Sequence, residues 1–221
     1  MADVDGLVQV LRGLSSFPSE LPGFDPGAAL ETPTSQFATW LDDAVAAGIL
    51  APHAATLSTA DSDGRVSGRT LVLRGIEDDG WVFSSHGESG KGRDIEANPN
   101  AALTFFWATL GRQVRVAGPV RTLDAERAAL DFLGRPESGR ASSLVGHQSE
   151  PLDSKDTYTR AEAEALEAVR ADPRIVAGDW RCYAIVADTV EFWQASADRA
   201  HVRLRYTRES PSSWTRQLLW P

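Results

Sequence analysis

The sequence predicts a mainly β fold with flanking helices. Apolar and polar residues alternate with period two over 54–60, 65–75, 81–86 and 112–122. A run of mostly apolar residues at 101–107 also predicts a strand, and further strands are expected at 181–187, 189–194 and 201–207. Turns rich in Asp and Gly, at Asp61–Gly64 and Glu77–Gly80, separate the first three segments and indicate hairpins. Short strands joined in this way favour a closed antiparallel barrel with helices packed outside it.

A helical spacing of apolar residues predicts the helices. Apolar residues recur three and four positions apart at Phe37, Trp40, Leu41, Ala44 and Val45. Thr34 and Ser35 are candidate N-caps for this helix, and Gly48 is placed to end it. Further helices are expected over 5–13, 89–97, 124–134 and 157–171, with a Gly/Ser-rich connection between the last two. Residues 1–33 are expected to form an N-terminal arm, and residues 34–221 one domain.

Composition and charge exclude several classes of protein. The chain has 221 residues, 42% of them hydrophobic and 24% charged, as in ordinary globular proteins. A net charge of −9 argues against sequence-independent binding of nucleic acid, although a local Arg cluster can still bind a small anion. The single Cys182 excludes an internal disulfide and paired-thiol sites. An acidic N-terminal segment and the lack of a long apolar stretch predict a cytoplasmic protein with no membrane partner.

A glycine-rich turn between a predicted strand and a predicted helix is the first candidate site. The segment Gly87–Gly92 does not match the P-loop, because Ser85 and Gly92 stand where that motif needs Gly and Ser or Thr. Backbone N–H groups and Lys91 could nevertheless hold a phosphate there. The alternative is an ordinary solvated turn.

The second candidate site is the segment Arg199–Arg203. In a strand, Arg199, His201 and Arg203 would project from one face, with Trp193 just upstream. Such clustered cations suit an anionic ligand, although a charged solvent-facing edge is equally compatible with the pattern.

Other familiar chemistries find no support in the sequence. His53, His86 and His147 lack metal-ligand spacing, so no metal is expected. No G-x-S-x-G motif and no carboxylate pair suited to glycoside hydrolysis is present.

Taken together, the motifs of the chain resemble the pyridoxine/pyridoxamine 5′-phosphate oxidase family of FMN-dependent enzymes, including its phenazine-biosynthesis branch. The resemblance runs from about Phe37 to Pro221 and rests on R-T-L-V-L-R (69–74), V-F-S-S-H-G-E-S-G-K (82–91), N-P-N-A-A-L-T-F-F-W (98–107), L-G-R-Q-V-R-V-A-G (110–118), H-Q-S (147–149) and V-E-F-W-Q…R-A-H-V-R (190–203). It implies an FMN-binding split β-barrel that forms a homodimer, with FMN sites at the subunit interface.

The resemblance also assigns roles to single residues. It implies FMN contacts for Arg69, Thr70, Leu71, Val72, Leu73, Ser84, Ser85, Lys91, Gln113, Gln148, Ser149, Trp193 and Arg203. It implies that Arg199 and His201 are catalytic residues that hold the substrate over the flavin. Reduction makes the flavin ring anionic, so cations and hydrogen-bond donors near the ring stabilise the product.

The chain departs from the family pattern around the substrate. The family places Lys, Tyr and Ser where this chain has Arg74, Asp131 and Gly139, and of the residues for the substrate phosphate only Arg135 is retained. Gly90 replaces a second basic residue for the FMN phosphate. A carboxylate at position 131 disfavours a phosphorylated substrate. One arrangement pairs Asp131 with Arg135 and leaves Arg74 to bind a single carboxylate.

These departures favour one function among three. The leading hypothesis is an FMN-dependent oxidase that transfers a hydride from a reduced nitrogen-containing ring to flavin, with dioxygen as acceptor, in phenazine-type secondary metabolism. The first alternative is a pyridoxine/pyridoxamine 5′-phosphate oxidase of vitamin B6 metabolism. The second is a non-catalytic flavin- or haem-binding module. Arg199, His201, Gln113 and Gln148 favour catalysis over the second alternative.

Overall fold

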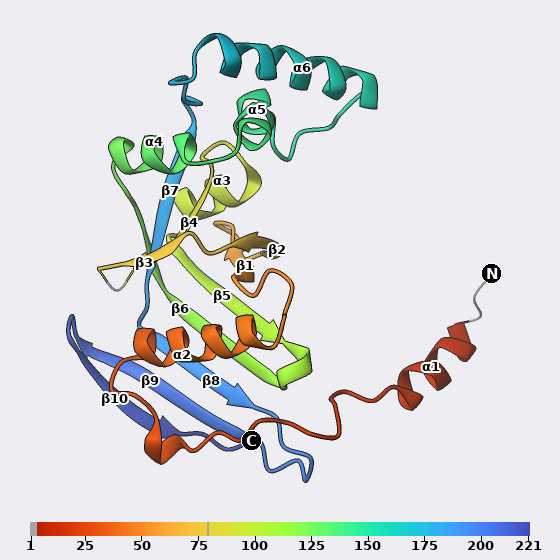
Figure 1. Ribbon diagram of the computed structural model, residues 1–221, viewed down its shortest axis with the longest axis vertical. Helices are drawn as coiled ribbons and strands as arrows, with labels where there is room; N and C mark the ends of the chain where they lie inside the picture. Colours follow the sequence, from red (N-terminus) through yellow and green to blue (C-terminus); the bar gives the residue numbers. More distant parts are fainter. Residues whose placement is uncertain (1–3, 79) are drawn as a thin grey trace. The chain divides into compact units, whose positions relative to one another are not determined.

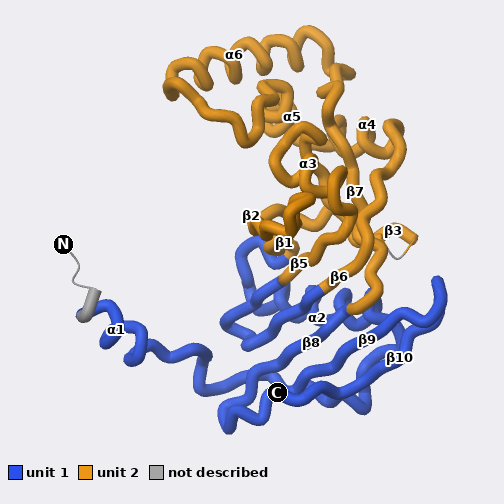
Figure 2. Tube along the Cα trace, turned by 180° about the vertical axis from the view of Figure 1, so that it is seen from behind, with its two compact units in different colours: residues 1–52, 105–115, 190–221 blue, residues 53–104, 116–189 orange. Residues whose placement is uncertain are grey.

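The computed structural model describes residues 4–78 and 80–221, and the chain divides into two compact units (Figures 1 and 2). Unit 1, blue in Figure 2, comprises the residues up to Pro52 together with Phe105–Arg115 and Val190–Pro221. Unit 2, orange, comprises His53–Thr104 and Val116–Thr189. Strands β5 (Asn100–Trp107) and β6 (Arg112–Thr122) each contribute residues to both units. In the described part of the chain, no helix is both long and apolar enough to cross a membrane.

Unit 1 is built on the antiparallel strands of the C-terminal segment and on α2. The strands β8 (Thr189–Gln194), β9 (Val202–Ser210) and β10 (Ser213–Leu218) lie in the order β10-β9-β8, with β6 next. Helix α2 (Pro33–Ala46) buries the apolar face that the sequence predicts, with the Trp40 ring 5.1 Å from Phe192 and Phe37 4.8 Å from Phe105. This helix gives unit 1 an aromatic core.

The N-terminal segment packs within unit 1. It contains α1 (Val4–Gly13), close to the predicted helix, and a short 3₁₀ turn η1 (Pro26–Ala28). The Tyr206 hydroxyl donates a hydrogen bond of 2.7 Å to the Leu30 carbonyl oxygen, and the Phe17 ring lies 5.6 Å from Trp193. The residues after α1 are therefore held by contacts with β8 and β9.

Two details of unit 1 correct the sequence prediction. The N-cap of α2 is Thr32, not Thr34 or Ser35, because Pro33 begins the helix and the Thr32 hydroxyl accepts the Ser35 N–H at 3.2 Å. Residues 213–218, which the sequence analysis did not include among the strands, form the edge strand β10. The side chains of β10 are mostly polar and exposed, so its sequence lacks the alternating apolar pattern that predicts a strand. Backbone pairing with β9 stabilises it.

Unit 2 contains two antiparallel sets of strands. Strand β1 (Ala54–Ala60) pairs with β2 (Val66–Val72) and with β5. Strand β4 (Gly80–His86) pairs with β3 (Gly75–Glu77) and β7 (Trp180–Val186), which in turn pairs with β6. The predicted strand 65–75 is wrong in extent, because β2 ends at Val72 and β3 is separate. The predicted turn at 77–80 includes Asp79, which lies outside the described residues.

The helices of unit 2 include one that the sequence analysis missed. Helices α3 (Gly90–Ala97), α4 (Ala125–Leu133) and α6 (Lys155–Ala171) lie close to their predicted positions. The segment expected as a connection contains α5 (Glu137–Val145), which lies beside α6 in Figure 1. Ser and Gly give α5 low helix propensity. Packing of Ala141 against Ala165 and Val169 of α6 stabilises α5 despite this low propensity.

Candidate functional site

Unit 2 contains a pocket of about 1090 Å³. Its wall gathers predicted cofactor residues that are far apart in the sequence: Arg69, Thr70, Leu71, Val72, Ser84, Ser85, Lys91, Gln148 and Ser149. Leu73 does not line this pocket, and its backbone N–H donates to the His53 carbonyl oxygen at 2.9 Å. The end of β2, the end of β4, the start of α3 and the loop after α5 therefore form one site.

The glycine-rich turn positions Lys91 at the start of α3. The Ser89 hydroxyl caps the helix, accepting the Gly92 N–H at 3.2 Å and donating to the His86 carbonyl oxygen at 2.7 Å. A Cβ atom at Gly92 would lie 1.9 Å from the Gly87 carbonyl oxygen, so only glycine allows this close approach. The turn thereby fixes Lys91 in the first turn of the helix.

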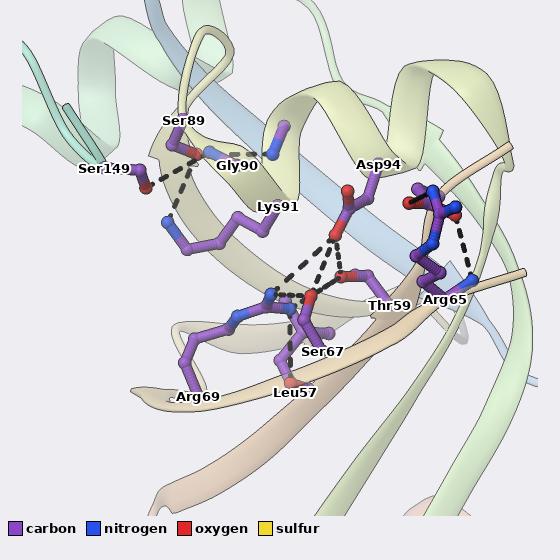
Figure 3. A network of polar contacts seen from close by, with 12 residues as sticks. Leu57, Thr59, Arg65, Ser67, Arg69, Ser89, Gly90, Lys91, Asp94 and Ser149 are labelled. Atoms are coloured by element: carbon purple, nitrogen blue, oxygen red, sulfur yellow. Dashed lines mark hydrogen bonds and ion pairs between the residues drawn. The ribbon is translucent and has the colours of Figure 1, made fainter. Parts of the chain in front are cut away.

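The Lys91 ammonium is half-buried and bonded only to neutral groups. Its Nζ donates to Ser85 Oγ at 2.8 Å, to Ser89 Oγ at 3.2 Å and to Gln148 Oε1 at 2.8 Å, and Figure 3 shows the bond to Ser89. Burial, with repulsion from Arg69 second, lowers the pKa of Lys91 to about 8. A cation held in this way keeps its charge available to an anion.

Arg69 lies beside Lys91, but one of its neighbours is a carboxylate. Its guanidinium donates to Thr59 Oγ1 at 2.7 Å and lies 3.8 Å from Asp94 (Figure 3). Asp94 also accepts from Thr59 at 2.6 Å and from Ser67 at 3.0 Å. Burial lowers the pKa of Arg69, and attraction to Asp94 opposes this shift. The sequence analysis missed Asp94, whose only signal is its position three residues after Lys91 on the same helix.

The residues at this end of the pocket fit the phosphate of a flavin mononucleotide. Lys91 and Arg69 supply charge, and the N-terminus of α3 supplies the backbone N–H of Gly90, which donates to Ser149 Oγ at 3.2 Å. The basic residue that the family pattern places at position 90 has no equivalent here. A Cβ at Gly90 would lie 3.5 Å from that hydroxyl, an ordinary contact, so Ser149 fills part of the space.

Asp131 is paired with Arg74, and the alternative pairing with Arg135 is wrong. Arg74 Nε donates to Asp131 Oδ1 at 2.8 Å, and Trp180 Nε1 donates to Oδ2 at 3.1 Å. The Asp131 side chain is only 2% exposed. Burial favours a higher pKa for Asp131, but hydrogen bonds from Arg74, Ser84 and Trp180 outweigh it and hold the pKa below its ordinary value. This carboxylate is therefore a fixed negative charge.

The four predicted substrate residues of unit 2 differ in their access to the pocket. Arg135 lines it, and its guanidinium lies 4.6 Å above the centre of the Trp180 ring. Arg74, Asp131 and Gly139 are not part of the lining. A Cβ at Gly139 would lie 3.8 Å from the Arg135 guanidinium, an ordinary contact, so Gly139 lies next to that side chain. The sequence analysis gave Trp180 no role in the site.

The pocket wall also includes residues that no sequence motif marked. Ser142 of α5 and Tyr158 of α6 line it, with their hydroxyl oxygens 3.2 Å apart. Tyr158 also donates to Glu162 Oε1 at 3.0 Å. Ser142 was not assigned because α5 was expected to be a connection, and Tyr158 was not assigned because no motif marks it within the predicted helix.

The remaining predicted residues, Gln113, Trp193, Arg199, His201 and Arg203, lie in unit 1. The Trp193 and His201 rings are 5.0 Å apart. The Ser196 N–H donates to His201 Nδ1 at 3.0 Å, which places the proton of the neutral imidazole on Nε2. His201 can therefore offer an N–H donor at its outer nitrogen.

The two arginines in this segment of unit 1 have different surroundings. Arg203 donates to Glu191 at 2.9 Å and to the Trp220 carbonyl oxygen at 2.9 Å. Arg199 is exposed and has a left-handed backbone with φ of 64°. The expectation that Arg199, His201 and Arg203 share one strand face is wrong, because β9 begins at Val202 and the first two residues lie in the preceding turn.

Comparison with known protein families decides the assignment. The pyridoxamine 5′-phosphate oxidase model matches residues 41–170, and the pyridoxine 5′-phosphate oxidase C-terminal dimerisation region matches residues 180–221. The chain belongs to the pyridoxamine 5′-phosphate oxidase family. A pyridoxine/pyridoxamine 5′-phosphate oxidase of Burkholderia multivorans is 39% identical over 199 residues, which cover 89% of this chain and 92% of that protein.

Two solved structures support the same fold. PhzG from Burkholderia lata, crystallised with tetrahydrophenazine-1-carboxylic acid, matches with a TM-score of 0.83 and 29% identity over 94% of this chain and 100% of that one. A pyridoxamine 5′-phosphate oxidase-related, FMN-binding protein of Nostoc punctiforme matches in fold, with a TM-score of 0.70 and 18% identity over 86% of this chain and 98% of that one. The predicted resemblance, the split-barrel fold class and the assignment as an oxidoreductase of the pyridoxamine 5′-phosphate oxidase type are confirmed.

Proposed function

We propose that this member of the pyridoxamine 5′-phosphate oxidase family is an FMN-dependent oxidase. It takes a hydride from a reduced nitrogen-containing ring and uses dioxygen as acceptor, in phenazine-type secondary metabolism. The observation that carries the cofactor assignment is the pocket of unit 2, whose wall holds Lys91, Arg69 and the N-terminus of α3 together. The match of residues 180–221 to a dimerisation region supports a homodimer.

Different residues of the proposed cofactor site would hold the phosphate and the ring of FMN. FMN, when bound, would supply a ring that accepts a hydride from the substrate and passes electrons to dioxygen. Lys91 and Arg69 would hold the phosphate, and the backbone of Thr70, Leu71 and Val72 would line the ring. The family pattern also implies cofactor contacts for Gln113, Trp193 and Arg203.

The substrate is proposed to be held by Arg199 and His201. His201 presents Nε2–H as a donor, since its Nδ1 already accepts from Ser196. Hydride transfer depends on correct placement of the reduced ring more than on a strong base. A phenazine-type ring is favoured over a vitamin B6 phosphate because Asp131 is buried and occupies Arg74, one of the cations that a substrate phosphate would need.

One alternative has an observation in its favour. The relative from Burkholderia multivorans, 39% identical, carries the name pyridoxine/pyridoxamine 5′-phosphate oxidase, and Arg135 is retained at the pocket wall. Vitamin B6 phosphate oxidation is therefore the second candidate.

A peroxide assay separates the two functions. The purified protein should be yellow and release FMN on denaturation. It should form hydrogen peroxide with a reduced phenazine carboxylic acid and show at least about tenfold lower kcat/KM with pyridoxine 5′-phosphate. Efficient oxidation of pyridoxine 5′-phosphate would favour the alternative. A protein that stays colourless when given FMN would refute both.

Substitutions of residues in unit 1 test the proposed catalytic roles. Arg199→Ala and His201→Ala should lower kcat about tenfold to a hundredfold and leave flavin bound, because both residues are proposed to hold substrate. Arg203→Ala should instead reduce flavin retention. Turnover at the wild-type rate in the first two variants would contradict their assignment.

A further inference from the structure

The pocket wall includes Arg135, a cation that lies over an aromatic ring. The Arg135 guanidinium carbon lies over the Trp180 ring, 4.6 Å from its centre, and both side chains line the pocket. Arg135 Nε is buried and has no hydrogen-bond partner among the described residues. Burial lowers the pKa of Arg135, while attraction from Asp131 opposes that shift. Because Arg135 lines the pocket and its Nε has no acceptor among the described residues, the guanidinium can present its other N–H groups to an anionic ligand.

Trp180 forms a rigid platform for this cation. Only 6% of the residue is exposed, and its indole N–H is fixed on Asp131 Oδ2 at 3.1 Å. The rings of His86 and Phe132 meet it at steep angles, with centres 5.2 and 5.7 Å away. Stacking on an aromatic face leaves the in-plane N–H groups of a guanidinium free to meet a carboxylate side-on.

Asp131 joins this platform to the second cation. One carboxylate oxygen accepts from Trp180, and the other accepts from Arg74 Nε at 2.8 Å. The charge of Arg74 is therefore compensated inside the protein, and Arg74 is not part of the pocket lining. The net charge of the three groups Arg74, Asp131 and Arg135 is a single positive charge, carried at the pocket by Arg135.

We propose that Asp131 and Trp180 set the substrate charge that the pocket accepts, by occupying Arg74 and fixing Arg135 as a receptor for one carboxylate. The favoured substrate is then a planar ring with a single carboxylate, in preference to a phosphomonoester. A phosphomonoester carries nearly two negative charges at neutral pH and needs more than one available cation. This inference rests on the proposed function and specifies its substrate class. Arg135 contacts the substrate, whereas Asp131 and Trp180 act through it as positioning residues.

Calorimetric titration of the flavin-loaded protein tests the charge receptor without requiring turnover. The probes are phenazine-1-carboxylate and its neutral counterpart of the same shape, phenazine-1-carboxamide. The wild-type protein should bind the carboxylate at least about tenfold more tightly, and Arg135→Gln should reduce this ratio to below about threefold. Arg160→Gln, which removes an exposed arginine of α6, is the matched control and should keep the wild-type ratio.

The positioning residues are tested with pyridoxal 5′-phosphate as a third probe. Asp131→Asn should release Arg74 and shift the affinity ratio of pyridoxal 5′-phosphate to phenazine-1-carboxylate at least about fivefold toward the phosphate. Trp180→Phe keeps a ring under Arg135 but removes the donor to Asp131, and it should shift the ratio in the same direction. This second variant decides the matter if Asp131→Asn fails to fold.

The outcomes separate this inference from the proposed function. Equal binding of carboxylate and carboxamide by the wild-type protein, or an unchanged ratio in Arg135→Gln, would overturn the inference even if reduced rings are oxidised. Unchanged ratios in both Asp131→Asn and Trp180→Phe would also overturn it. If the protein prefers the carboxylate probe over the carboxamide but oxidises no reduced ring, the proposed function is refuted, and the inference about Arg135 stands.

Discussion

Lys91 and Arg74 are both assigned to phosphate groups by the family pattern, yet the structure gives them partners of different kinds. Lys91 donates to neutral oxygens, among them Ser85 Oγ and Gln148 Oε1, each at 2.8 Å. Arg74 donates to the buried carboxylate of Asp131 at 2.8 Å. A neutral acceptor orients a cation and leaves its charge for a ligand, whereas a buried carboxylate cancels that charge. The partner, more than the residue type, decides whether a cation forms an anion site.

The largest expected effect comes from breaking the Arg74 pair. Asp131→Ala removes a buried carboxylate and leaves Arg74 and the Trp180 indole N–H without their acceptor. We expect a loss of about 3 kcal/mol in the free energy of unfolding, measured by urea denaturation. Because the folded-state pKa of Asp131 is lowered, its contribution is present near neutral pH and is lost as the pH falls below about 4. A loss under about 0.5 kcal/mol at pH 7 would contradict the role of this pair.

Removing the other cation should affect ligand binding more than stability. Lys91→Ala deletes the ammonium proposed to hold the FMN phosphate, and FMN affinity should fall by about 1–3 kcal/mol. The matched control is Lys155→Ala, which changes the only other lysine of the chain, an exposed residue at the start of α6. Fluorescence titration of the apoprotein with FMN measures both. Equal FMN affinities in the two variants would contradict the comparison.

The lowered pKa of Lys91 makes a third, smaller effect measurable. Its ammonium loses its proton near pH 8, so FMN affinity should fall as the pH rises through that value. Lys91→Arg keeps the positive charge over the same range and should flatten this dependence. Titrations of the apoprotein between about pH 7 and 9.5 would show the difference. The same slope in the wild type and the arginine variant would assign the effect to another group.

The smallest expected effect is a change in FMN affinity on substitution of Gly90, near the proposed position of the FMN phosphate. Gly90 stands where the family pattern has a basic residue, and a Cβ there would meet Ser149 Oγ at an ordinary distance of 3.5 Å. Gly90→Arg should therefore be accommodated and raise FMN affinity by about 1 kcal/mol, through an added charge-assisted contact. Gly92→Ala is the contrasting variant, since its Cβ would collide with the Gly87 carbonyl oxygen. A weaker FMN complex in Gly90→Arg would show that this space is needed by the cofactor.

Most elements of the fold were predictable because their signals are local. Strands such as β1 and β8 alternate with period two, α2 carries an apolar stripe, and Ser89 caps α3 at the glycine-rich turn. Helix α5 and strand β10 were missed for the opposite reason. Their stability comes from Ala165 and Val169 of α6 and from β9, partners that are distant in the sequence or presented only by the folded chain.

The sequence by itself determined the family, the fold class and the kinds of residue at the cofactor site, because motif order and residue type are written along the chain. Only the tertiary structure decided which cation pairs with which carboxylate. The sequence analysis considered a pair of Asp131 with Arg135, but the fold brings Arg74, 57 positions away, and Trp180, 49 positions away, onto its two oxygens. Electrostatic pairing depends on distance and burial in space, and neither quantity is encoded in local spacing.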